Sequence, residues 1–144
     1  MSEKILSIEE LQNYRLPWQA GDLTFHSEMD GWRVTTDAQD VLFLIDNSQD
    51  CGDAWGYACS DDNPSDFIGA TLLEVRLTDE ARRTPFMAKI DSGSAEFRYG
   101  GAAQFVDFIT DRGLLQFAVY NEHNGNYSHS VYIQGNGMSV TRYI

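Results

Sequence analysis

The chain has 144 residues, of which 42% are hydrophobic and 12% aromatic, a composition that excludes a disordered polypeptide. This length is typical of one domain with a core of its own, so we expect a single domain, 1–144. Ten basic and 22 acidic residues give a formal net charge of −12, which argues against direct binding to nucleic acid or an anionic membrane.

Two further absences in the sequence bear on where the protein works. No apolar run approaches the roughly 20 residues that span a bilayer. The first residues also lack the basic start and apolar stretch of a secretory signal. We therefore expect a protein of the cytoplasm that has no contact with a membrane.

The N-terminal segment predicts one short helix. Ser7 is a typical N-cap, and the two acidic residues that follow Ile8 favour the positive end of a helix dipole. Apolar residues recur at helical spacing as far as Tyr14, and Pro17 ends the pattern. We expect a helix over residues 7–14.

After this segment the pattern is typical of strands separated by turns. A turn is expected at residues 29–31, between two strands, and the apolar run 41–45 predicts a strand buried on both faces. Residues 115–120 and 127–133 are expected to form one hairpin with a loop at 121–126. The predicted strands are 22–28, 32–36, 41–45, 70–77, 86–90, 95–99, 105–110, 114–121, 127–134 and 138–144. The expected fold is mainly β, an antiparallel sandwich or open barrel with one short N-terminal helix.

Three short motifs follow one another in a recognisable order. They are Gln49-Asp50-Cys51, then Asp66 followed by Ile68-Gly69, and last Asn124-Gly125 followed by Tyr127-Ser128. In this order they resemble a family of small uncharacterised β-rich domains of bacteriophages and bacteria. The likeness covers roughly residues 40–134 and departs from the family pattern at Gly52-Asp53 and at Asn126. It implies a related β-rich fold and a phage or prophage origin, and no activity.

Metal binding and catalysis have little support in the sequence. Cys51 and Cys59 are expected to be reduced, partly buried thiols, and their spacing to His123 and His129 is not that of a zinc site. Residues 61–66 carry oxygen ligands without the regular alternation of a calcium loop. Neither a nucleophile elbow nor a phosphate-binding loop is present. We therefore expect no metal, no cofactor and no enzymatic activity.

Two alternatives stay open, and both use the loop near residue 125. A small ligand or nucleotide could bind in a pocket between the loop of Trp55 and the hairpin at 121–129, or a hydrolase could use His123 or His129 with a nearby Asp. The residues of this possible ligand loop are His123, Asn124, Tyr127 and His129. A further alternative is an accessory phage protein whose acidic residues serve only to keep it soluble.

The distribution of charge is the most informative feature. No Lys or Arg lies between Arg33 and Arg76, a stretch that contains nine acidic residues and should form a negative patch. Trp55 and Tyr57 are expected in a loop of this stretch, as aromatic anchors for a basic partner. The predicted partner-binding residues are Asp46, Asp50, Asp53, Trp55, Tyr57, Asp61, Asp62 and Asp66.

These observations lead to one hypothesis of function. The protein would be an acidic, non-enzymatic inhibitor of phage or prophage origin, a monomer or small homodimer. It would mimic nucleic acid and block the basic, nucleic-acid-binding surface of a host protein, such as an anti-phage defence complex.

Overall fold

The computed structural model describes residues 3–47, 55–61, 63–78, 102–121 and 130–144. They form nine β-strands and one short 3-10 helix, η1 (Pro64–Phe67). Within these residues, no helix has the length and apolar character needed to cross a membrane. The strands are β1 (Glu3–Ala20), β2 (Leu23–Thr36), β3 (Asp40–Asp46), β4 (Trp55–Cys59), β5 (Thr71–Thr78), β6 (Ala102–Thr110), β7 (Gly113–Asn121), β8 (Ser130–Gly135) and β9 (Met138–Tyr143).

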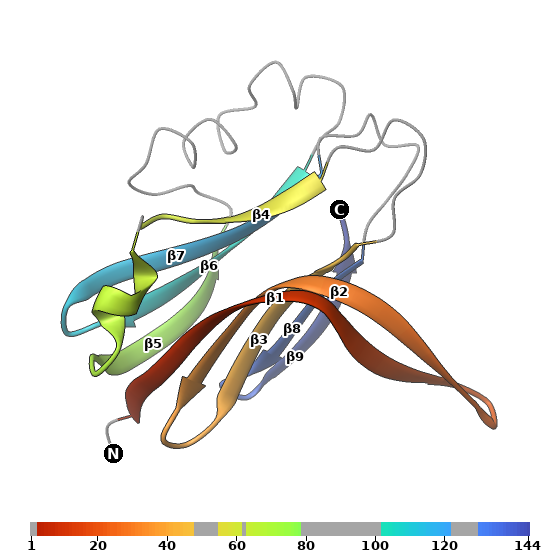
Figure 1. The fold of residues 1–144 in the computed structure, drawn as a ribbon, viewed down its shortest axis with the longest axis horizontal. Helices are drawn as coiled ribbons and strands as arrows, with labels where there is room; N and C mark the ends of the chain where they lie inside the picture. Colours follow the sequence, from red (N-terminus) through yellow and green to blue (C-terminus); the bar gives the residue numbers. More distant parts are fainter. Residues whose placement is uncertain (1–2, 48–54, 62, 79–101, 122–129) are drawn as a thin grey trace.

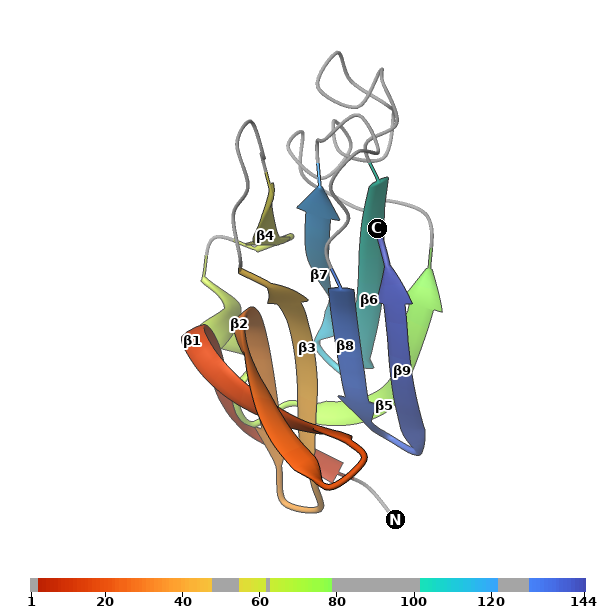
Figure 2. The same cartoon turned by 90° about the vertical axis from the view of Figure 1, so that its right-hand side faces the viewer.

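The strands form one open antiparallel sheet in the order β4-β7-β6-β5-β1-β2-β3-β8-β9. Only two residue pairs join β1 to β5, Glu3 with Leu72 and Lys4 with Thr71. At this narrow junction the sheet folds over, so that β4-β7-β6-β5 form one half and β1-β2-β3-β8-β9 form the other (Figures 1 and 2). The expected mainly antiparallel β fold is confirmed, and within the described residues the sheet ends at β4 on one side and β9 on the other.

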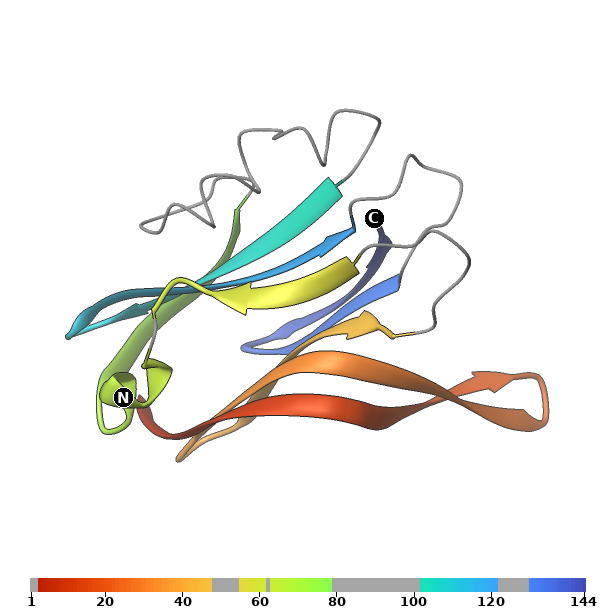
Figure 3. The same cartoon turned by 45° about the horizontal axis from the view of Figure 1, so that its top comes forward.

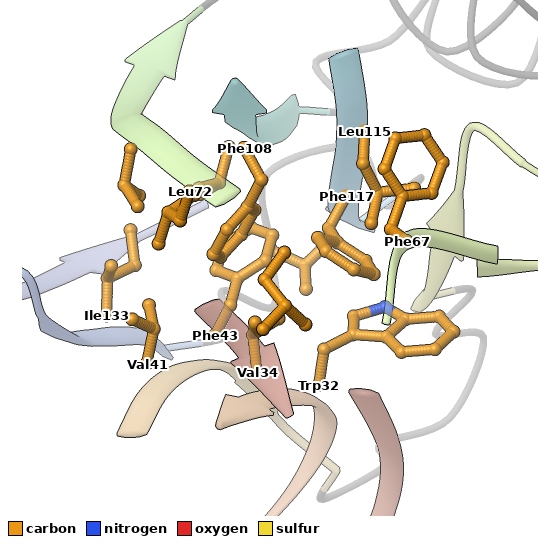
Figure 4. Close-up of a cluster of buried hydrophobic side chains, with 14 of the residues drawn as sticks. Trp32, Val34, Val41, Phe43, Phe67, Leu72, Phe108, Leu115, Phe117 and Ile133 are labelled. Carbon is orange, nitrogen blue, oxygen red and sulfur yellow. The ribbon is translucent and has the colours of Figure 1, made fainter. Parts of the chain in front are cut away.

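The main hydrophobic core lies between the two halves. Figure 4 shows Val34 and Phe43 from one half directed toward Phe108 and Phe117 from the other. The rings of Phe108 and Phe117 meet edge to face, with centroids 5.3 Å apart. Phe67 of η1 also packs against this core, and all five of these side chains are buried. Burial of apolar area between the halves is therefore what holds the folded sheet closed.

Strand β3 confirms the prediction of a strand buried on both faces. Val41, Phe43 and Ile45 belong to the main core. Leu42 and Leu44 alternate with them, so they point to the opposite face, where they join a second buried cluster with Met29. The run is continuously apolar because both faces of the strand are covered.

The predicted helix over residues 7–14 is wrong, because these residues belong to β1 and pair with β2. Two bulges interrupt the pairing, one between Ile5 and Ser7 and one between Leu11 and Tyr14. Each bulge inserts one residue and moves the next inward side chain along by one position. The apolar residues therefore recur at a spacing that imitates a helix, although the backbone is extended.

The predicted turn at residues 29–31 is also wrong, because β2 runs through it without interruption. Gly31 pairs with Leu11 on one side and with Leu44 on the other. Its φ of 152° and its close approach to the carbonyl oxygen of Phe43 leave no room for a Cβ atom. Glycine is thus required for the contact between strands, and no turn is made here.

The expected hairpin of residues 115–120 with 127–133 is wrong as well. Residues 115–120 do form a strand, but β7 pairs with β6 on one side and with β4 on the other. Strand β8 therefore joins the other half of the sheet, between β3 and β9. Residues 111–113 form the turn that joins β6 to β7. The predicted strands 86–90 and 95–99 lie outside the described residues.

The β1–β2 hairpin is longer than the strands around it and projects from the body as an arm (Figure 3). Near its tip Trp18 and Phe25 face each other as a register pair, with ring centroids 4.7 Å apart and nearly parallel planes. Pro17 is tolerated in this part of β1 because the segment pairs with β2 alone. We call residues 14–29 the arm.

Candidate functional site

Trp55 and Tyr57, expected in a loop, lie on β4, which pairs with β7 at an edge of the sheet. Large side chains alternate with Gly56 and Ala58 along the strand, so Trp55, Tyr57 and Cys59 face the main core and are half-buried. The alternation of large and small residues is a strand signal that could have been found in the sequence.

Tyr57 connects β4 to the opposite half of the sheet. Its ring meets Trp32 of β2 edge to face, with centroids 5.8 Å apart. Its hydroxyl donates a hydrogen bond to Oε1 of Glu10 at 2.5 Å and accepts one from Nε2 of Gln12 at 3.2 Å. Burial raises the pKa of Tyr57, and the hydrogen bond to Glu10 and the nearby carboxylates add to this. The phenol is therefore neutral at neutral pH and serves as a donor.

Asp30 is the second carboxylate close to Tyr57, and its charge also raises the pKa of that phenol. Its Oδ1 accepts hydrogen bonds from the backbone N–H of Asn13 and from Nδ2 of Asn47, both at 2.9 Å. Glu10 is bonded directly to the Tyr57 hydroxyl, whereas Asp30 acts on it through its charge, and we call these three residues the Tyr57 cluster. The sequence prediction missed both carboxylates because it placed them in a helix and in a turn.

The remaining acidic residues of the predicted patch are divided between two places. Asp46 lies at the end of β3, next to the arm, where it pairs in register with Met29. Asp61 precedes η1 and Asp66 lies within it, and two residues after η1 the N–H of Gly69 donates to the carbonyl of Ile5 near the start of β1. The structure therefore does not gather these carboxylates on one face. Asp50, Asp53 and Asp62 lie outside the described residues.

The oxygen atoms of the segment near η1 are used within the segment itself. Asp61 accepts a hydrogen bond from the backbone of Asn63, and Asp66 accepts one from Nδ2 of Asn63. Nη1 of Arg112 donates to the carbonyls of Asp66 and Ile68 at 3.0 and 2.9 Å, which brings a cation to this site. Within the described part of the chain, no group of three or more His, Cys, Asp or Glu side chains could hold a metal ion.

Of the other candidate residues, Cys59 ends β4 and is half-buried. Cys51 and the possible ligand loop of His123, Asn124, Tyr127 and His129 lie outside the described residues. The small-ligand and hydrolase alternatives for that loop therefore stay predictions.

A buried polar network crosses β5, β6 and β7. Asp107 is fully buried, and its Oδ1 accepts a hydrogen bond from Nε2 of Gln116 at 2.7 Å. The other carboxylate oxygen lies 3.6 Å from Nη2 of Arg76, whose side chain is half exposed. The backbone N–H of Gln116 in turn donates to Oγ of Ser60 at 2.9 Å. The network supplies partners to buried polar groups and ties three strands together.

A groove of about 470 Å³ lies between the arm and the strands β3, β8 and β9. It is on the face of the sheet opposite the main core, because it shares Met29 and Tyr132 with the second cluster. Its lining is mostly apolar and aromatic, with one carboxylate and three hydroxyl-bearing side chains from serine and threonine. The lining residues are Leu16, Pro17, Trp18, Ser27, Met29, Asp46, Ser130, Tyr132 and Thr141.

Comparison with known proteins identifies the family of the chain. A domain of unknown function, DUF7448, matches residues 2–133. The chain belongs to this family. Its match spans nearly all of the β-sheet, from β1 into β8, so the arm and the Tyr57 cluster lie within the DUF7448 domain. Neither a curated protein nor a solved structure matches the chain.

Proposed function

We propose that this DUF7448 protein is a non-enzymatic acidic binding protein that occupies a basic surface of a partner protein. The observation that carries the proposal is the net charge of −12 together with the many carboxylates that are exposed in the described part of the chain. Between described side chains, ion pairs join Arg33 to Glu9 and Arg76 to Asp107. Exposed carboxylates occur on both halves of the sheet, at Glu10, Asp22, Glu28, Asp37, Asp40, Asp66, Glu74 and Asp111.

A large net negative charge acts mainly on the rate and selectivity with which the protein associates with a partner. An acidic surface attracts a Lys/Arg-rich surface over several ångströms, and salt screens that attraction. The Tyr57 cluster supports the proposal at close range, since it places an aromatic ring and two carboxylates at one position. A guanidinium group of a partner could pair with such carboxylates and stack on such a ring.

The resemblance to phage and bacterial domains supports the finer part of the proposal. A basic surface that binds DNA or RNA is a natural target for an acidic protein, because both present closely spaced negative charges. We therefore place the protein in a phage or prophage setting, in the host cytoplasm, as an inhibitor that mimics nucleic acid. A host defence protein would be its target, and its own enzymatic activity would play no part.

The test begins with capture of partners from a nuclease-treated bacterial lysate at low and high salt, and identification by mass spectrometry. The captured protein is then bound to a fluorescent DNA or RNA duplex, and our protein is added as a competitor. We expect displacement of the duplex at low salt and weaker displacement at high salt. The charge variant for this assay replaces four acidic residues with Asn, at Asp50, Asp53, Asp61 and Asp62.

A matched control removes the same number of charges outside the stretch between Arg33 and Arg76. It replaces Asp79, Glu80, Glu96 and Asp111 with the corresponding amides. We expect the first variant to compete at least about tenfold less well than the control variant. Equal competition by wild type and both variants, at low salt, would refute the electrostatic mechanism.

A further inference from the structure

The groove between the arm and β8–β9 has features of a binding site that the acidic surface alone does not explain. Trp18 lines it and is 47% exposed, although its ring stacks on Phe25, which is 41% exposed. Two large aromatic rings are thus stacked on each other while both remain accessible to solvent. Exposed aromatic side chains are typical of residues that anchor a partner.

The polar groups of the groove indicate the sign of the charge that its ligand carries. Asp46 is its one carboxylate, and Ser27, Ser130 and Thr141 contribute hydroxyls. No cationic side chain lines the groove among the described residues, and the whole chain carries a charge of −12. A carboxylate offers about four acceptor positions, so Asp46 can accept a donor from a ligand in addition to contacts within the fold. The groove is therefore suited to a cation with an apolar or planar body.

Among biological cations, the arginine side chain fits this lining best. Its planar guanidinium stacks on aromatic rings and pairs with a carboxylate, whereas lysine offers a strongly hydrated point charge. The same face already contains one such contact, because the guanidinium carbon of Arg33 lies 5.4 Å from the ring centroid of Tyr14. A second copy of this chain is a poor occupant, since two surfaces of a −12 protein repel each other.

We propose that this groove binds an arginine side chain of the partner protein, with the guanidinium between Trp18 and Tyr132 and paired with Asp46. The inference rests on the proposed function and deepens it, because it names one contact by which a basic partner is held. It assigns the arm a role in recognition, and it explains why the stacked pair of Trp18 and Phe25 extends beyond the core.

The test uses the isolated protein and a defined probe. The chain has three tryptophans, so the indole N–H signals in a ¹⁵N–¹H spectrum are few, and Trp18→Phe identifies one of them. The probe is the peptide acetyl-Gly-Arg-Gly-amide, with the citrulline and lysine peptides as neutral and point-charge analogues. We expect a saturable shift of the Trp18 signal with the arginine peptide, and little change at Trp32 or Trp55.

Matched variants decide whether the groove is the site. Trp18→Ala and Asp46→Asn should each weaken binding of the arginine peptide at least about fivefold. Glu74→Gln removes the same charge from β5, at an exposed position away from the groove, and should leave binding unchanged. Equal affinity of Trp18→Ala and wild type, or equal affinity for the arginine and citrulline peptides, would overturn the inference.

These outcomes separate the inference from the proposed function. If the partner protein is bound in a salt-dependent manner and Trp18→Ala has no effect on that binding, the groove is not the anchor and the acidic mechanism survives. If the arginine peptide binds in the groove but no basic protein is displaced from nucleic acid, the proposed function is wrong and the groove is a cation site in its own right.

Discussion

The hydroxyl of Tyr57 on β4 donates a hydrogen bond to Oε1 of Glu10 on β1, across 47 positions of sequence. The two strands belong to opposite halves of the folded sheet, and among the described strands the backbone pairing between the halves is confined to the narrow junction of β5 with β1. This bond, with the edge-to-face contact of Tyr57 on Trp32, joins the halves on the side away from that junction. The Tyr57 cluster is therefore part of the closure of the fold as well as a candidate contact surface.

The first prediction concerns the titration of Tyr57. Its pKa is raised from the ordinary value of 10.0, first by burial and then by its bond to Glu10 and the nearby carboxylates. The stability that this phenol contributes is fully present below pH 10 and is lost as the pH rises through the higher pKa of the folded state. A difference titration of phenolate absorbance, wild type minus Tyr57→Phe, should show a group that ionises above pH 10.

Glu10→Gln is the control for this titration. It removes the negative charge beside the phenol and leaves an amide that can still accept the hydrogen bond. We expect the pKa of Tyr57 to fall toward its ordinary value in this variant, because a charged acceptor next to a phenolate is the more unfavourable neighbour. An unchanged pKa in Glu10→Gln would show that burial alone causes the shift.

The second prediction tests the close contact at Gly31. A Cβ at this position would overlap the carbonyl oxygen of Phe43, and the φ of 152° is unfavourable for any other residue. Gly31→Ala should therefore lower the free energy of unfolding by about 2–4 kcal/mol, measured by denaturation in urea. Gly137→Ala, at a φ of 77° with nothing within 4 Å, carries the backbone strain without the overlap and should cost about 1 kcal/mol. Equal losses of free energy of unfolding in the two variants would contradict a steric overlap at Gly31.

The third prediction concerns the buried carboxylate of Asp107. Gln116→Leu removes the amide that donates to it at 2.7 Å and should lower the free energy of unfolding by about 1–3 kcal/mol. In the double variant Asp107→Leu with Gln116→Leu, the loss should be smaller than the sum of the two single losses, because no buried charge remains without its amide donor. Strictly additive losses in a urea denaturation series would show that the two side chains are not coupled.

The fourth prediction concerns the attachment of η1 to the β6–β7 turn. Arg112 holds this segment through two backbone carbonyls, and Arg112→Met keeps the apolar stem but removes the donors. Amide exchange at residues 66–70 should become faster, with a loss of about 1 kcal/mol in global stability. Arg15→Met removes the same charge from the exposed arm and should leave exchange in this segment unchanged. Unchanged exchange in both variants would contradict a tethering role for Arg112.

Only the chemistry of the candidate contact surface could be predicted from the sequence. Net charge and the pairing of aromatic with acidic residues are visible in composition, and the structure contains such a combination in the Tyr57 cluster. Tyr57 was predicted as a contact residue, but its two carboxylates could not be named, because Glu10 and Asp30 come close to Tyr57 only when the sheet folds over. The groove was missed for the same reason, since its residues come from the arm and from β3, β8 and β9.

For the fold, local sequence determined the strands whose pattern is simple. The run Val41–Ile45 is apolar on both faces, and Asp111-Arg112-Gly113 makes a tight turn, so both could be predicted. Tertiary structure alone decided which strands pair: β7 is flanked by β6 and β4, which leaves β8 to join β3. The bulges of β1 and the close approach at Gly31 likewise depend on a neighbouring strand. Turns and alternation are set by nearby residues, whereas strand order and bulges depend on which distant surfaces bury the most apolar area together.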